Sequence, residues 1–122
     1  KLNSAQALDK ATSLVVSVLD EARSLTLSAK GDSEYGVYLD TSSVVLFKGD
    51  VYSYSDPLNV ITEVNDKVGI RNVTLTGGGS SVVFKRLTGS TDNVGTLELY
   101  LKASTTIMRT INVSATGVIS VN

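Results

Sequence analysis

The chain has 122 residues, the length of one ordinary domain, with 11 basic and 12 acidic side chains and a net charge of −1. It contains no Cys and no His, which excludes thiol or imidazole nucleophiles, disulfides, and zinc or haem sites built from those ligands. The balanced charge gives no overall attraction to nucleic acid or anionic membrane. We therefore expect a non-enzymatic protein without cofactor or metal, and a hydrophobic content of 42% suffices for a packed core.

The first thirty residues predict one long helix. Apolar side chains recur there every three or four positions, which places them on one helical face. That face comprises Ala5, Leu8, Ala11, Val15, Val18, Ala22, Leu25 and Ala29. Lys30 and Gly31 have the chemistry of a helix C-terminus. At ~1.5 Å per residue the helix would exceed the diameter of a domain of this size, so we expect its first turns to project beyond the rest of the protein.

After the helix, Val, Ile and Thr dominate, which predicts a β-rich body over residues 31–122 that forms one domain with the helix, residues 1–30. Turn signals separate about seven or eight short strands. We expect them at residues 35–40, 43–48, 60–64, 68–75, 80–87, 95–102, 107–114 and 118–121. The connections are too short for parallel crossovers. The predicted fold class is therefore α+β, with a long N-terminal helix packed on antiparallel β-sheets.

Some of these segments carry more specific expectations. Segments 35–40 and 43–48 should pair as a hairpin, and Gly77-Gly78-Gly79 should form a flexible hairpin turn. In segment 95–102 apolar and polar residues alternate, so one face should be buried against the helix. That face comprises Leu97, Leu99 and Leu101. The buried face expected for segment 107–114 comprises Ile107, Ile111 and Val113, interrupted by Arg109.

Two loops are candidates for ligand sites. Gly77-Gly78-Gly79 resembles part of a phosphate-binding loop, but no Gly-Lys-Ser/Thr motif and no predicted helix follow it. Ser90-Thr91-Asp92-Asn93 is the nearest approach to a calcium loop, yet it supplies one carboxylate where calcium needs several oxygen ligands. The preferred interpretation of both is a turn, and we assign no residue to catalysis, cofactor binding or metal binding.

Four cations in the C-terminal strands form a candidate DNA-binding patch. Lys85, Arg86, Lys102 and Arg109 could share one surface and hold a DNA backbone. The alternative is that they are solvated strand residues that guard sheet edges. We prefer this alternative, so nucleic acid is not an expected partner.

The order of the segments resembles a known family. The helix ends in Asp-Glu-Ala-Arg-Ser-Leu-Thr-Leu-Ser-Ala at residues 20–29 and leads directly into a hairpin built on residues 36–39 and 44–47. The later features are Phe84, Gly89, the strand Gly95-Thr96-Leu97-Glu98-Leu99, Ile111-Asn112-Val113 and Gly117-Val118-Ile119. Over nearly the whole chain this pattern resembles the H-type minor pseudopilins of type II secretion and the related FimT/FimU-like minor type IV pilins.

The resemblance implies a pilin-like fold and a membrane anchor. Members of that family begin with a cleaved leader and a hydrophobic half-helix that carries a glutamate, whereas this sequence begins at Lys1. We therefore expect residues 1–30 to be the second half of a truncated pilin helix. Many minor pilins carry a C-terminal disulfide, and the absence of Cys departs from that pattern.

The resemblance also implies a structural subunit of a type IV pilus or of a type II secretion pseudopilus. Such a subunit is anchored in the inner membrane, faces the periplasm or the cell exterior, and assembles with other pilins. The helix face expected to pack against neighbouring subunits comprises Ala5, Leu8, Ala11 and Val15. Two alternatives stay open: a DNA-binding minor pilin for DNA uptake that uses the four cations, and an unrelated β-rich binding or phage structural domain with a helical stalk.

Overall fold

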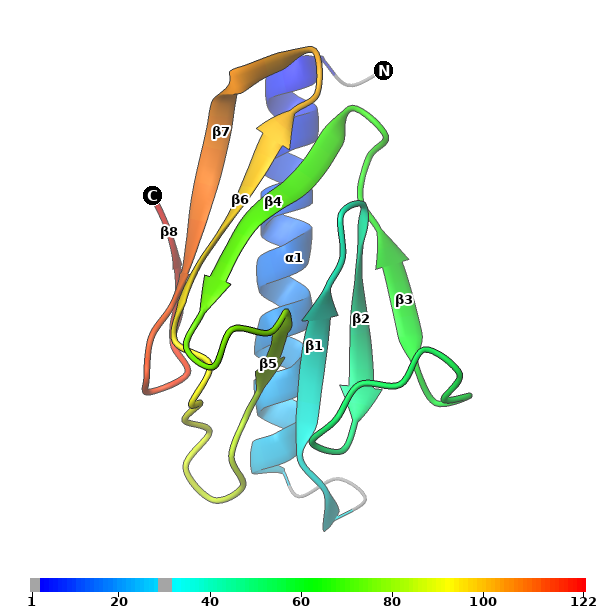
Figure 1. The fold of residues 1–122 in the computed structure, drawn as a ribbon, viewed down its shortest axis with the longest axis vertical. Coiled ribbons are helices and arrows are strands. Elements are labelled where there is room, and N and C mark those ends of the chain that lie inside the picture. The colour runs from blue at the N-terminus through cyan, green and yellow to red at the C-terminus, as the bar shows by residue number, and fades with distance from the viewer. Residues whose placement is uncertain (1–2, 29–31) are drawn as a thin grey trace.

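A computed structural model describes residues 3–28 and 32–122, in which one helix, α1 (Ser4–Leu27), lies behind two β-sheets (Figure 1). Asn3 caps the helix, because its side chain accepts the Gln6 N–H at 2.8 Å while the Gln6 side chain accepts the Asn3 N–H. At the other end the Ser28 N–H donates to the Ser24 carbonyl. The C-terminal residues expected from the sequence, Ala29, Lys30 and Gly31, lie outside the described residues.

The apolar face predicted for the helix is buried over most of its length. Of its described members, Ala5 is exposed and Leu25 is half-buried, and the remainder are buried in the core. The buried surface is wider than predicted and includes Ala7 and Leu19 as well as two threonines. The buried hydroxyl of Thr12 donates to the Leu8 carbonyl at 2.8 Å, which satisfies it within the helix. The face is wide because α1 packs against two sheets at once.

The eight strands form two four-stranded antiparallel sheets, which confirms the predicted fold class. The first sheet has the order β3 (Val60–Glu63), β2 (Ser43–Lys48), β1 (Tyr35–Leu39), β5 (Ser81–Val83). The second sheet has the order β4 (Val68–Leu75), β6 (Gly95–Leu101), β7 (Ser104–Val113), β8 (Ile119–Val121). Both sheets turn one face to α1, and the single core lies between the helix and these faces (Figure 1).

Most strands lie where the sequence predicts them, but one predicted connection is wrong. The hairpin β1–β2 and the buried Leu97, Leu99 and Leu101 of β6 are confirmed. The prediction that Gly77-Gly78-Gly79 forms a hairpin turn is wrong, because this loop joins β4 of the second sheet to β5 of the first. The loop at residues 64–67 also crosses between the sheets, from β3 of the first to β4 of the second. Strand β5 also ends at Val83, four residues earlier than expected.

The expectation that the first helical turns project beyond the β body is wrong from Ala7 onward. Ala7 and Leu8 are fully buried, because the β6–β7 hairpin extends along the helix as far as Ser4 (Figure 1). Ile107 lies near this end and is exposed, so it does not belong to the buried face of β7 as predicted. Within residues 3–28 and 32–122, no helix combines the length and apolar character needed to cross a membrane.

Candidate functional site

The helix face predicted to contact other subunits belongs mostly to the core of this chain. Leu8, Ala11 and Val15 are buried against the two sheets, so a neighbouring subunit cannot reach them in the folded domain. Ala5 is the one member of this set that is exposed. The accessible side of α1 carries Leu14, at the border of the buried face beside Ala7 and Ala11, and polar residues such as Ser17.

The four candidate DNA-binding cations do not gather on one surface. Lys85 and Arg86 follow β5 near the end of the helix, whereas Lys102 lies in the β6–β7 turn near its start. Three of the four pair with carboxylates, and these pairs are Lys85–Asp92 at 2.9 Å, Arg86–Asp32, and Arg109–Asp9 at 3.1 Å. The distribution is that of charged residues scattered over strands and turns, and no continuous phosphate-binding stripe results.

The two loops considered for phosphate or calcium lie side by side. Gly77, Gly79 and Asp92 line one open cavity of about 420 Å³, together with Glu34 and Asp50. The Asp92 carboxylate is engaged by Lys85, as above. In the part of the chain that the structure describes, no group of three or more acidic side chains is arranged to hold a metal ion.

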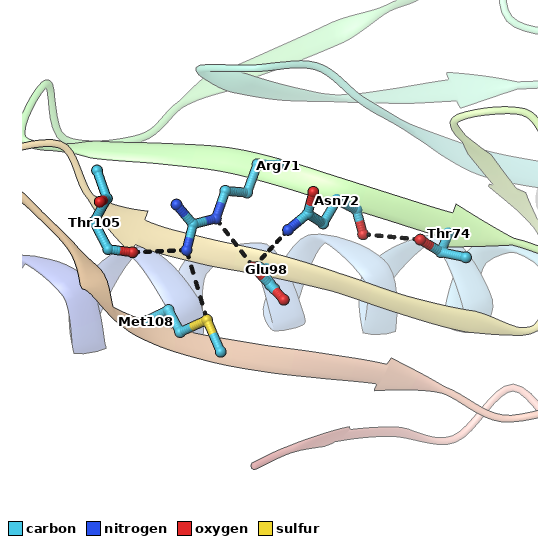
Figure 2. Close-up of polar contacts among 6 residues, drawn as sticks. All are labelled: Arg71, Asn72, Thr74, Glu98, Thr105 and Met108. Atoms are coloured by element: carbon cyan, nitrogen blue, oxygen red, sulfur yellow. Dashed lines mark hydrogen bonds and ion pairs between the residues drawn. The ribbon is translucent and has the colours of Figure 1, made fainter.

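A polar cluster on the outer face of the second sheet was missed by sequence reasoning. Arg71 of β4 donates from Nε to Oε1 of Glu98 on β6 at 3.0 Å and from Nη2 to the Thr105 carbonyl of β7 at 2.7 Å (Figure 2). Its guanidinium also lies 4.2 Å from the centre of the Tyr100 ring. One side chain thus connects three neighbouring strands.

The neighbouring residue extends this cluster. Asn72 has a left-handed φ of +51° at an irregularity in the β4–β6 pairing, and its side chain donates to Glu98 Oε1 at 2.9 Å. The hydrogen bond from Arg71 is the main cause that lowers the pKa of Glu98, and the bond from Asn72 adds to it. These contacts hold neighbouring strands of the sheet together. They depend on how the strands are aligned, which residue types alone do not reveal.

A second polar contact fixes the helix to two distant loops. Arg23 donates from Nε to the Gly89 carbonyl at 3.0 Å and from Nη2 to the Thr116 carbonyl at 3.3 Å. Gly117 lies against the same guanidinium. The sequence pattern that resembles the minor pilins includes Arg23, Gly89 and Gly117. The structure brings these three residues together, and we call this contact the clamp.

Exposed apolar side chains concentrate around the outermost strand of the first sheet. Five of the twelve exposed large apolar side chains among the described residues lie on β3 and in the loop before it, namely Val51, Tyr54, Leu58, Val60 and Ile61. Leu58 and Val60 also line a groove of about 350 Å³ between this strand and Leu25 of the helix. A surface of this kind is suited to contact with another protein.

Comparison with solved structures shows which known fold this architecture resembles. Two crystal structures of FimU, a type IV minor pilin from Pseudomonas aeruginosa strain PAO1, superimpose with TM-scores of 0.69 and 0.70 at 15% sequence identity. The alignments cover 94% of this chain and 92% or 87% of the FimU chain. No family model and no curated protein sequence matches the chain. The chain therefore has the fold of a minor pilin.

Proposed function

We propose that the protein is a structural, non-catalytic subunit of a pilin-type filament, either a type IV pilus or a type II secretion pseudopilus. The observation that carries this proposal is the likeness to a minor pilin over 94% of the chain. The sequence supports it independently, because the order of segments resembles the same group of proteins. In this role the protein assembles with other pilin subunits.

The proposal includes a membrane anchor supplied by residues upstream of Lys1. A hydrophobic segment there would continue α1 into the inner membrane and hold the β-sheets in the periplasm or at the cell surface. Since the apolar face of α1 is filled by the sheets, contact with other helices would use the exposed side that carries Leu14. We assign the subunit contact to that side in place of the buried residues.

Deletion and complementation of the gene in its own host test the proposal. Loss of the gene should reduce the number of surface filaments or the amount of secreted protein, and the wild-type gene should restore it. Leu14→Asp should fold normally but restore less, because it places a charge on the exposed helix side. The matched control is Thr74→Asp, an equally charged change at an exposed residue of β4. Full assembly and secretion in the deletion strain would contradict the proposed function.

A further inference from the structure

Backbone groups at the inner edges of the two sheets form hydrogen bonds within the chain. In the described residues, the outer edge strands have no strand paired on their outer side. On the inner edge of the first sheet, the Val83 N–H of β5 donates to Asn93 Oδ1 at 2.9 Å, and its carbonyl accepts the Thr91 hydroxyl at 2.7 Å. On β4 the Ile70 N–H donates to the Thr41 carbonyl at 2.9 Å. The outer strands are β3 and β8, which lie on opposite flanks of the molecule (Figure 1). Within the described residues no strand pairs with their outer sides.

The hydrogen-bond pattern shows which groups of β3 point outward. The Val64 N–H donates to the Ser42 carbonyl, and the register continues with Thr62 opposite Val44. In an antiparallel pair every second residue directs its backbone groups to the partner strand. Ile61 and Glu63 are therefore the residues whose N–H and C=O groups face away from the sheet.

The same reasoning applies to β8 on the other flank. Asn122 exchanges backbone hydrogen bonds with Thr110 of β7, and Ser120 lies opposite Asn112. Ile119 and Val121 therefore direct their N–H and C=O groups away from the sheet.

Side-chain orientation differs between the two edges. Ile61 lies opposite Val45, whose side chain is outside the helix-facing core, so Ile61 points to the outer face of its sheet. Ile119 and Val121 lie opposite core residues of β7, so their side chains point toward the helix layer. Ser120, between them, points to the outer face.

The directions of the strands allow β3 of one copy and β8 of another to pair. The arrows of β1, β3 and β6 run the same way in Figure 1, and β8 runs with β6 because both are antiparallel to β7. Two copies placed side by side in the same orientation thus bring β3 and β8 together in parallel. In a parallel pair, a residue whose N–H and C=O groups bond to the partner strand lies opposite a residue whose N–H and C=O groups point away from that strand. Ile61 therefore lies opposite Ser120, and both side chains point to the outer face.

We propose that β3 of one copy pairs in parallel with β8 of a second copy of this chain. The Ile61 N–H donates to the Ile119 carbonyl of the neighbouring copy, and the Ile61 carbonyl accepts the N–H of its Val121. An antiparallel pairing would instead join the outer face of one copy to the helix face of the next. The proposal rests on the proposed function, since this contact joins different surfaces and propagates copies in one orientation, as a filament requires.

The pairing would bury apolar side chains, but too little surface for two free copies to form a stable complex. Leu58, Val60 and Val121 are 61%, 55% and 46% exposed. The inward-pointing Ile119 of the neighbouring copy lies opposite Val60 in this register and would cover the groove beside it. Strands this short bury less than the roughly 1,000 Å² that stable free complexes need. The contact therefore forms mainly where other contacts hold the copies together and raise their effective concentration.

Cysteine cross-linking tests the proposed geometry, because the chain has no Cys of its own. A chain carrying Ile61→Cys is mixed with one carrying Ser120→Cys at roughly millimolar concentration and oxidised with diamide. Opposed residues of paired strands lie about 5 Å apart, within the reach of a disulfide. The matched control replaces Ser120→Cys by Val121→Cys, one residue further along and pointing to the other face.

The expected result is a mixed disulfide that forms at least about tenfold faster for the 61–120 pair than for the 61–121 pair. Adding Glu63→Pro to the first chain should slow it, since proline removes an outward N–H and leaves the β2–β3 bonds intact. Glu63→Ala should not. An unchanged melting temperature verifies that each variant folds. Val121→Pro in the second chain should also slow the cross-link, because it removes the N–H that donates to the Ile61 carbonyl.

Equal rates for the two pairs, or insensitivity to both proline substitutions, would overturn the proposal. Faster coupling of Ile61→Cys chains with one another would do the same, because it would indicate a symmetric contact. These outcomes are separate from the proposed function. A chain that enters filaments without this cross-link contradicts only the strand pairing, whereas a chain that cross-links but never enters filaments contradicts the filament role.

Discussion

Substitution of Gly117 should be unusually costly to stability. This residue lies in the turn between β7 and β8 with a φ of +86°, and an added Cβ would approach the Gly89 carbonyl oxygen to 2.0 Å and Arg23 Nε to 2.7 Å. The first of these atoms belongs to the backbone, so the turn itself must move. Such a movement also separates Arg23 from the carbonyls of Gly89 and Thr116.

Gly78 supplies a matched control for the conformational part of this cost. Its φ of +85° is nearly the same, but nothing lies within 4 Å of an added Cβ. Gly78→Ala should therefore cost only the left-handed conformation, about 1–2 kcal/mol. Gly117→Ala adds the loss of two charge-assisted hydrogen bonds, each about 1 kcal/mol here because the guanidinium is partly exposed. The total for Gly117→Ala is about 3–4 kcal/mol.

Urea unfolding of the two single variants measures this difference. Gly117→Ala should lower the free energy of unfolding by about 2 kcal/mol more than Gly78→Ala does. In an Arg23→Ala background the excess should shrink, because the clamp is already gone. Equal effects of the two glycine substitutions would refute the reasoning that the clamp contributes to stability.

Three further predictions concern the core and the surface ion pairs. Leu99→Ala should lower the free energy of unfolding by about 2–5 kcal/mol in urea titrations, because the side chain is fully buried. Glu98→Gln should weaken stability at neutral pH and flatten its acid dependence. The lowered pKa of Glu98 means that its contribution is present above the unfolded-state pKa and is lost as the pH falls through the folded-state value, which melting curves between neutral and acidic pH would reveal. Arg109→Gln should cost less than about 1 kcal/mol, because its pair with Asp9 is exposed, and a larger loss in thermal unfolding would contradict this.

The helix and most strands could be predicted from local patterns. A three-to-four-residue period identifies α1, and the alternation around Leu99 identifies β6, because each pattern reflects one buried face. The partners of these faces are set by chain topology instead. The loops after β3 and β4 cross between sheets, and no local turn signal distinguishes a crossing loop from a hairpin.

The candidate site residues were harder to predict for the same reason. Leu8, Ala11 and Val15 form an apolar stripe that looks the same whether it contacts the chain's own sheets or another subunit. The expected overhang failed because the domain is elongated along α1, whereas the size estimate assumed a sphere. The contacts of Arg71 and Arg23 join residues far apart in sequence, so they emerge only from strand register.

The most direct measurement for the filament role is quantitative mass spectrometry of filaments sheared from cells that express the full gene. If the protein is a pilin-type subunit, its peptides should be enriched in the sheared fraction together with those of other pilins. This enrichment should be lost in cells that cannot assemble filaments. Recovery of the protein only outside that fraction, from cells that carry abundant filaments, would contradict the account.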